Sequence, residues 1–180
     1  IAFLDETGLL MTPLVLRSWA PRGQTPVLRH RTRSHQKVSA IAAICVSPDR
    51  RRVALYFRLF PDANIRTPQV RAFLRSLLTE LSAPVLLLWD RLQAHRAKKI
   101  QTFVRETAQL STEWFPSYAP ELNPVEYLWA NLKGHHLANL PILDVHELAV
   151  IARRDVRSIQ RRDDLLCSFL RHSPLFLRLH

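Results

Sequence analysis

Hydrophobic side chains in the first half of the chain fall mostly into strand-like runs. Residues 38–46 and 85–89 are almost continuously apolar, which is typical of strands that are buried on both faces. Residues 53–60 alternate less regularly and also predict a strand. The apolar residues 1–4 predict another short strand, which ends at Asp5. These runs predict a β-sheet that draws most of its strands from the first half of the chain.

Helical spacing begins after the third strand. From Val70 to Leu81, apolar residues recur at i, i+3, i+4, i+7, i+8 and i+11, which is the spacing of an amphipathic helix. We expect this helix to begin with Thr67 as its cap and Pro68 as its first helical residue. Similar patterns predict three further helices and one short strand: helices over 95–109, from Asn123 to Gly134 and from Asp144 onward, and a strand over 112–115.

A hairpin is predicted near the amino terminus, with strands at 14–19 and 27–28 around a turn at 21–23. Residues 29–37, rich in arginine and histidine, are expected to form a basic exposed segment. Strands that precede alternating helices and strands predict an α/β fold, a mixed sheet with helices on its faces. The length, 180 residues, suits a single domain spanning residues 1–180.

Charge adds the first indication of function. The chain carries 26 Lys and Arg against 15 Asp and Glu, a net charge of +11 and a pI near 10.9. Such a balance predicts a polyanionic partner, usually nucleic acid. A membrane partner is less favoured, because the basic residues do not gather on an amphipathic helix and no apolar run approaches the ~20 residues of a membrane span. The two cysteines, Cys45 and Cys167, form no metal-binding or CxxC spacing, which fits a reducing intracellular compartment.

Three acidic residues carry the candidate chemistry. Asp5 and Asp90 each follow an apolar strand, and a buried strand delivers its last residue to the edge of the sheet. Neighbouring carboxylates repel each other unless a cation lies between them, and Mg²⁺ prefers oxygen ligands. Glu126, the third helical residue if Asn123 is the cap, can complete a site for two metal ions. Such a site performs in-line displacement at phosphorus.

Each acid also has a simpler explanation. An aspartate at a strand end is often a turn residue, and a glutamate at the third helical position is often half of a capping box. Their combination on a strongly basic chain favours the catalytic interpretation. Glu121 is the main rival to Glu126, but it lies before the helix in a proline-rich loop. Glu6 is expected to point to the opposite face of the strand from Asp5, toward supporting groups or solvent.

Three segments resemble mariner-superfamily insertion-sequence transposases. The segment FPSYAPELNPVEYLW (115–129), followed by Lys133, is similar to the signature loop and helix of that family. LLLWDRLQAH (86–95) resembles its second-aspartate motif, and FLDETG (3–8) with WAPRGQTP (19–26) resembles its first-aspartate motif. The match at 115–129 is strong, and the other two segments gain weight because their order and spacing agree with the family.

The resemblance implies a ribonuclease H-like fold in which Asp5, Asp90 and Glu126 are the catalytic, metal-binding carboxylates. It implies cleavage and transfer of DNA strands with two Mg²⁺ or Mn²⁺ ions and no small-molecule cofactor. It also implies a homodimer in the bacterial cytoplasm, associated with the nucleoid when bound to DNA. We expect the family's upstream helix-turn-helix region to be absent from this chain, and therefore weak DNA binding with little sequence preference. Arg91 stands where the family often has asparagine.

Several side chains are candidates for contact with DNA. Arg29, Arg31 and Arg33 are expected to grip the DNA backbone, although a plain solvated loop is nearly as compatible with them. His95 can contact a phosphate or orient the water, and it is equally compatible with a helix-start histidine that has no chemistry. Of the aromatic residues Trp114, Tyr118 and Trp129, we expect Trp129 to pack in the core. The candidate DNA contacts are Arg22, Arg29, Arg31, Arg33, Arg91, His95 and Lys133.

The leading functional hypothesis is a DNA transposase catalytic domain. Alternatives are a catalytically inactive DNA-binding remnant, a ribonuclease H-like nuclease outside transposition, and a ribosomal-type RNA-binding protein. The last explains the charge but leaves the three acids and the proline-rich loop unexplained.

Overall fold

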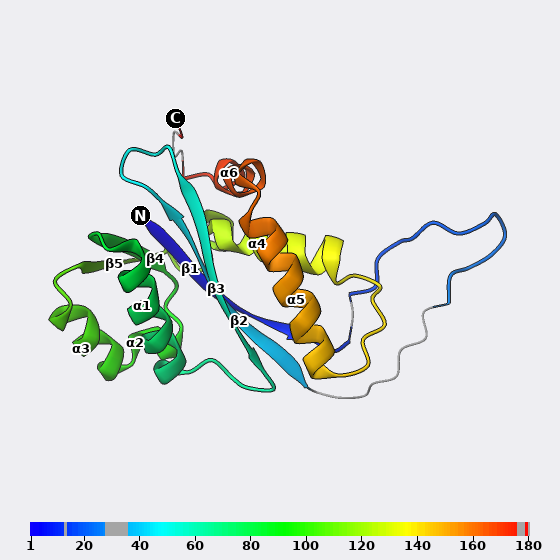
Figure 1. The fold of residues 1–180 in the computed structure, drawn as a ribbon, viewed down its shortest axis with the longest axis horizontal. Helices are drawn as coiled ribbons and strands as arrows, with labels where there is room; N and C mark the ends of the chain where they lie inside the picture. Colours follow the sequence, from blue (N-terminus) through cyan, green and yellow to red (C-terminus); the bar gives the residue numbers. More distant parts are fainter. Residues whose placement is uncertain (13, 28–35, 176–178, 180) are drawn as a thin grey trace.

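Five strands form one mixed sheet in the order β3-β2-β1-β4-β5 (Figure 1). The computed structural model describes residues 1–12, 14–27, 36–175 and 179. The strands are β1 (Ala2–Leu10), β2 (Lys37–Val46), β3 (Val53–Pro61), β4 (Val85–Trp89) and β5 (Leu110–Trp114). Strands β1, β2 and β3 pair antiparallel, whereas β4 runs parallel to β1 and β5 runs parallel to β4. The predicted α/β class with a mixed sheet is confirmed.

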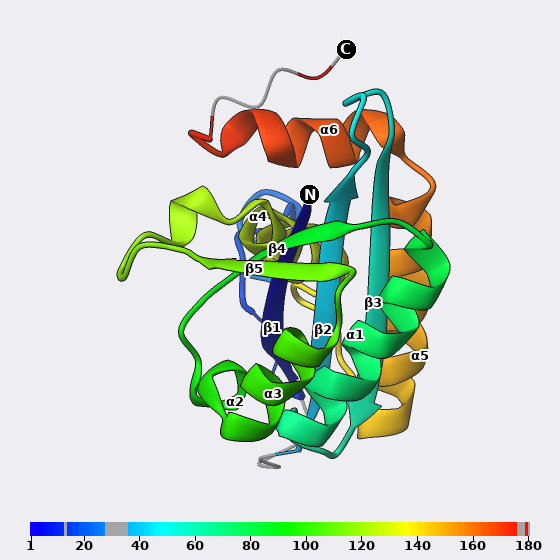
Figure 2. The ribbon, with the colours of Figure 1, turned by 90° about the vertical axis from the view of Figure 1, so that its left-hand side faces the viewer.

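Helices cover both faces of this sheet. One face carries α1 (Thr67–Leu81), α2 (Gln93–Arg96) and α3 (Lys98–Glu106), and the other carries α4 (Pro124–Asn131), α5 (Val145–Gln160) and α6 (Asp163–His172) (Figures 1 and 2). A 3₁₀ turn, η1 (Pro120–Leu122), precedes α4, and a π-helical turn, η2 (Leu132–His136), follows it. None of the helices in the described ranges is long and apolar enough to span a bilayer.

The inner strand β2, which lies between β3 and β1, explains why one sequence run is apolar at almost every position. Its residues alternate between two hydrophobic clusters: Ile41 and Ala43 pack beneath α1, while Ala40 and Ala42 pack beneath α4, α5 and α6. A strand between two helical layers has no solvent face, so the side chains on both faces are buried and almost all of them are apolar, with Ser39 as the exception. The strand predicted at 38–46 is therefore confirmed, as is its burial on both faces.

Helix α1 begins one residue earlier than its sequence suggests. Thr67 is the first helical residue and Arg66 is the cap, with its backbone N–H donating to Oε1 of Gln69 at 3.1 Å. The predicted apolar stripe is confirmed, because the side chains it contributes are buried: Val70, Phe73, Leu74, Leu77 and Leu78.

Two predicted helices have different bounds. The helix expected over 95–109 is two short helices, because Ala97 between them has an extended ψ of 136° that interrupts the helical hydrogen bonds. The helix that starts at Pro124 does not end at Gly134, because the π-helical turn η2 carries it to His136. The last long helix begins after Asp144, whose Oδ1 accepts from the backbone N–H groups of His146 and Glu147, as predicted.

The hairpin predicted between β1 and β2 is wrong for the described residues 14–27. The turn is present, with the N–H of Gln24 donating to the carbonyl of Pro21 at 3.0 Å, but no strand flanks it. Trp19 is 100% exposed, so its side chain has no core to pack against. The segment projects as a long loop whose base is held by Asn139, which makes two hydrogen bonds with the backbone of Leu16 (Figure 1). The basic residues Arg29, Arg31 and Arg33 lie outside the described residues.

Candidate catalytic metal site

The first aspartate lies in the middle of a strand and not at its end. Asp5 pairs with Ala42 of β2, and the antiparallel pairing continues to Leu10, opposite Lys37. The expectation that the strand ends at Asp5 is therefore wrong, because the long partner strand β2 extends β1 beyond its apolar run. Asp5 is only 9% exposed.

The parallel pairing of β1 with β4 brings the two aspartates together. Phe3 pairs with Leu88, so two further residues along each chain lead to Asp5 and Asp90. Strand β4 ends at Trp89, so Asp90 is the first residue beyond this strand and lies next to the part of β1 that carries Asp5. This is the carboxyl end of a parallel strand, where sheets of this class place their ligands.

The three predicted carboxylates line one cleft of about 400 Å³. Asp5 comes from β1, Asp90 follows β4, and Glu126 lies in the first turn of α4. Arg91 and the proline-rich loop line the same cleft. The structure thus brings together all three acids that were identified from the sequence. Glu121, the rival to Glu126, lies in η1 and is exposed, and it is not among the residues that line the cleft.

A buried asparagine fixes α4 against β1. Oδ1 of Asn123 accepts from the backbone N–H of Val125 at 3.2 Å, which caps the helix as predicted. Its Nδ2 donates to the carbonyl of Leu4 at 3.1 Å, immediately before Asp5. Asn123 is 4% exposed, so this bond is shielded from water. The helix cap therefore also sets the position of Glu126 relative to Asp5.

Asp5 sits in an unfavourable environment for a negative charge. Burial is the largest cause, and the charges of Glu126 and Glu6 add to it, so the pKa of Asp5 is raised to about 8. The hydrogen bond from Nε1 of Trp129 to Oδ2 of Asp5, at 2.9 Å, opposes this increase. Trp129 is 2% exposed, which confirms that it packs in the core. A divalent cation between the carboxylates would compensate the charge that the protein leaves uncompensated.

Asp90 has the opposite environment. Its Oδ1 accepts from the backbone N–H of Leu92 at 3.0 Å and lies 2.9 Å from Nδ1 of His95. Desolvation opposes its charge, but these hydrogen bonds outweigh it and hold the pKa of Asp90 below its usual value. Asp90 is therefore ionised and oriented in the absence of metal.

His95 joins Asp90 to the glutamate that follows Asp5. Its Nε2 lies 2.8 Å from Oε1 of Glu6, and its ring stacks on Trp89 with centroids 4.5 Å apart. Burial disfavours its charge, but hydrogen bonds to Asp90 and Glu6 outweigh burial and raise the pKa of His95 to about 10. Because both ring nitrogens face a carboxylate, we assign a proton to each.

Glu6 points away from Asp5, as predicted from strand alternation. Asp5 contacts Trp129 of α4 on one face of the sheet, whereas Glu6 contacts His95 of α2 on the other. Ligand atoms of Glu6, Asp90 and His95 also lie within 4.8 Å of one another, but a His95 that carries a proton on both ring nitrogens has no lone pair to offer a cation. The all-oxygen set of Asp5, Asp90 and Glu126 suits Mg²⁺ or Mn²⁺ better, because imidazole nitrogen favours softer transition metals.

The candidate DNA contacts separate into three groups. Arg22 and Arg91 are exposed, and Arg91 lines the cleft. Lys133 donates from Nζ to Oγ1 of Thr7 at 2.6 Å, so it lies beside the strand that carries Asp5. His95 is 0% exposed, which contradicts a direct phosphate contact because its ring is enclosed by Trp89 and two carboxylates.

The aromatic candidates for base stacking also differ in how exposed their rings are. Tyr118 is fully exposed in the loop that lines the cleft. Trp114 is half-buried and stacks on Trp89 with centroids 5.5 Å apart. Of the three candidates Trp114, Tyr118 and Trp129, Tyr118 alone therefore has its ring free to meet a base.

Two links in the site could not be identified from the sequence. The bond from Asn123 to Leu4 and the contact between His95 and Glu6 each join segments more than 80 residues apart in the chain. The sequence carries one hint of this arrangement. His95 follows Asp90 closely in the chain, so its imidazole lies about one turn after the carboxylate and can reach it.

Solved structures with the same fold include complexes of a mariner transposase. The chain is 18% identical to the protein in "Crystal structure of the Mos1 Strand Transfer Complex", with a TM-score of 0.69 over 96% of this chain and 51% of that one. It is 18% identical to the Mos1 mariner paired end complex with Mn, with a TM-score of 0.67 over 96% and 52%. For the catalytic domain of Mos1 mariner transposase, identity is 16% and the TM-score is 0.59 over 95% and 74%. The chain thus spans about half the length of the first two proteins.

These similarities establish the ribonuclease H-like fold that the sequence resemblance implied. No match was found among curated protein sequences. A family model described as DDE superfamily endonuclease matches residues 1–149, which include all three carboxylates of the cleft. The chain belongs to the DDE superfamily of endonucleases.

Proposed function

We propose that this chain is the catalytic domain of a DNA transposase in which Asp5, Asp90 and Glu126 hold two divalent metal ions. The observation that carries the proposal is the meeting of these carboxylates, from three separate elements, in one cleft of a DDE-family chain. Such a pair of ions, when bound, activates an attacking oxygen and stabilises the leaving oxygen at phosphorus.

The protein's own groups divide the remaining work. Trp129 fixes Asp5 by a buried hydrogen bond, and His95 fixes Asp90 with the support of Glu6. Asn123 sets the start of the helix that carries Glu126. Rigid carboxylates cost little reorganisation when metal and substrate arrive, which is the basis of electrostatic preorganisation. The donor set contains only carboxylate oxygens and fits Mg²⁺ or Mn²⁺.

DNA is the substrate in this proposal. The net charge of +11 suits a polyanion, and Arg91 and Tyr118 stand at the cleft, where a phosphate and an unstacked base can meet them. The similar Mos1 structures are a strand transfer complex and paired end complexes. By analogy with these structures, the proposal includes strand transfer and action as a homodimer. It also includes a location in the bacterial cytoplasm, where the protein associates with cellular DNA.

Two alternatives keep the same fold. The first alternative is a catalytically inactive remnant that only binds DNA. Such a protein needs the basic surface but not three converging carboxylates, so the presence of all three argues against this alternative. A nuclease outside transposition would use the same carboxylates for hydrolysis alone. Membership of an endonuclease family leaves the ribosomal-type alternative without support.

The test is nicking of supercoiled plasmid in Mg²⁺ or Mn²⁺. We expect the parent chain to nick, and Asp90→Ala and Glu126→Ala to bind plasmid without nicking. Glu121→Ala is the matched control, because Glu121 is an exposed acid close to Glu126 that does not line the cleft. Equal nicking by Glu126→Ala and the parent would refute the assignment. Transfer of a labelled 3′-hydroxyl end into a second duplex distinguishes transposition from hydrolysis.

A further inference from the structure

A second hollow lies on the face of the sheet that carries α1, α2 and α3, and it is strongly basic. It runs between the start of α1 and the junction of α2 with α3, the face turned toward the viewer in Figure 2. Five exposed cationic side chains line it: Arg58, Arg71, Arg75, Lys98 and Lys99. Among the described residues, no carboxylate lines it. None of these residues belongs to the catalytic cleft.

The five cations have no acidic partner in the described part of the chain. The ion pairs between an arginine and an acid that the structure records there belong to Arg154 and Arg162. Arg58 instead donates to the hydroxyl of Ser76 at 3.3 Å, and the guanidinium of Arg71 lies 5.7 Å from the ring centroid of Phe103. Like charges that share a groove without counter-charges repel each other, so an anionic ligand there would relieve the repulsion.

Small side chains form the rest of the lining. Thr67, Pro68, Ala72, Ser76 and Ala97 leave room between the long cationic residues, so an extended chain can approach the protein backbone closely. Long cations around a shallow floor of small residues fit a continuous phosphate backbone better than a compact anion.

The basic lining continues into a neighbouring hollow. Arg58 and Ser76 line both, and the second hollow adds Arg153 and Arg157 of α5. Neither arginine makes an ion pair in the described ranges, in contrast to Arg154, whose Nε lies 2.9 Å from Oδ1 of Asp155. The two hollows therefore form one path, and among the described residues that line it Glu80 is the one acid.

We propose that this path, defined here as the α1 groove, binds the phosphate backbone of a DNA duplex outside the catalytic cleft. The proposal rests on the proposed function for the choice of DNA as the polyanion. Contacts of this kind neutralise phosphates without reading bases, so they add affinity with no sequence preference.

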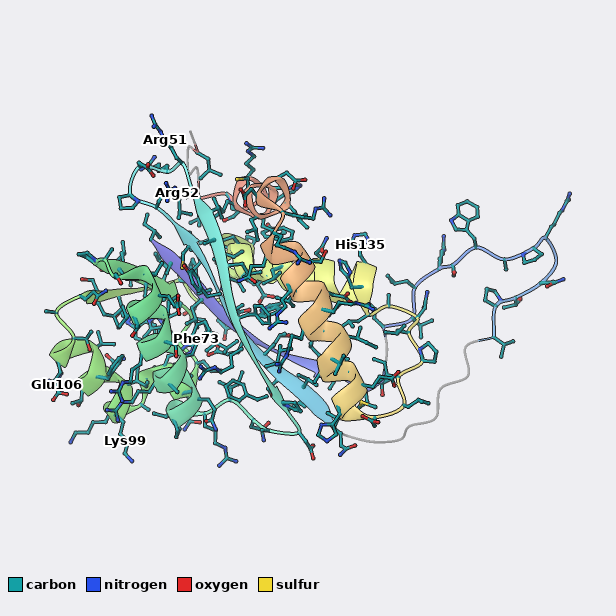
Figure 3. All side chains as sticks on the ribbon, viewed as in Figure 1. Arg51, Arg52, Phe73, Lys99, Glu106 and His135 are labelled. Carbon is teal, nitrogen blue, oxygen red and sulfur yellow. The ribbon has the colours of Figure 1, made fainter. Side chains whose placement is uncertain are left out.

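The experiment measures duplex affinity against salt concentration in EDTA, where no metal-dependent cleavage can occur. The groove variants are Lys98→Ala/Lys99→Ala and Arg153→Ala/Arg157→Ala. The matched control is Arg51→Ala/Arg52→Ala, which removes two adjacent exposed arginines from the β2–β3 turn, far from Lys99 (Figure 3). Each groove variant should weaken binding equally for unrelated sequences. Each should also make the slope of log affinity against log salt shallower by about 2, because each lost phosphate contact removes about 1.

The proposal fails if either groove variant behaves like the control. Thermal midpoints equal to that of the parent exclude loss of folding as the cause of weaker binding. Nicking is scored separately, so the two proposals can fail independently. A parent chain that does not nick, but whose groove variants lose affinity, would refute the catalytic assignment and retain the groove. If the parent chain nicks DNA and the groove variants keep full affinity, the catalytic assignment is retained and the groove proposal is refuted.

Discussion

The indole nitrogen of Trp129 donates a hydrogen bond to Oδ2 of Asp5 at 2.9 Å, and both side chains are buried. This bond joins α4 to the central strand of the site, and it is the contact that favours the ionised form of Asp5 against burial and neighbouring charge. The aromatic ring thus has two roles, one in the core and one at the carboxylate.

Replacing Trp129 by phenylalanine separates these roles. Trp129→Phe keeps an aromatic ring but removes the donor, so the pKa of Asp5 should rise further and Mn²⁺ should bind more weakly. Loss of a group that supports a metal ligand typically lowers affinity by roughly 10- to 100-fold. Titration calorimetry measures the change. Trp114→Phe is the control, because Trp114 stacks on Trp89 and donates to none of the carboxylates in the described structure. Unchanged affinity in Trp129→Phe would show that the bond has no role in metal binding.

The His95 bridge predicts a loss of metal affinity from a residue that touches no substrate. Glu6→Gln weakens the support of the imidazolium, and His95→Gln removes it, so Asp90 should lose its fixed orientation. We expect metal affinity to fall by roughly 10-fold or more in His95→Gln, and by less in Glu6→Gln. Calorimetric Mn²⁺ titration and single-turnover nicking should move together. A normal metal affinity with reduced nicking would instead place His95 in a later step.

Metal binding should strengthen as pH rises toward 8. Asp5, with a pKa raised to about 8, is largely protonated at pH 6 in the metal-free chain, and a metal ion must displace that proton. Titrations in buffers of different ionisation enthalpy should therefore show release of about one proton at pH 6 and less above pH 8. Asp5→Asn should abolish the proton release together with most of the affinity. A pH-independent affinity between 6 and 8 would contradict the raised pKa.

Stability without metal should have the opposite pH dependence. The pKa of Asp5 is about 3.9 unfolded and about 8 folded, so the folded state holds more protons between these values. Stability then falls as pH rises from about 4 to 8 and shows no further change from this group above 8. His95, raised to about 10, adds a second fall from about 6.5 upward. Urea unfolding in EDTA at several pH values checks this. Asp5→Asn should flatten the lower part of the profile, and a parent profile that is already flat there would count against the prediction.

Asn123→Ala should destabilise the fold by roughly 2–4 kcal/mol. The change removes a helix cap and leaves the carbonyl of Leu4 unsatisfied in the core. Urea unfolding in EDTA measures this without metal linkage. Asn64→Ala, at an exposed position, is the control and should change stability little. An effect no larger than that of the control would mean that water replaces both hydrogen bonds.

The sequence determined those elements whose cause is local. Residues 38–46 are apolar at almost every position because β2 faces a helical layer on each side, and the repeat from Val70 to Leu81 defines the buried stripe of α1. Asn123 and Pro124 specify where α4 begins, so Glu126 could be placed in its first turn from the chain alone. The order of strands and helices was sufficient to predict a mixed sheet.

Only the tertiary structure decided what depends on distant partners. Strand β1 extends past Asp5 because β2 pairs with it as far as Leu10, whereas residues 14–27 are exposed and pair with no strand in the described part of the chain, so they lack the predicted strands. The contact between Glu6 and His95 requires that β1 and β4 lie side by side. Local patterns record the burial and backbone preferences of a segment, whereas pairing, carboxylate spacing and pKa arise from groups that meet only after the chain has folded.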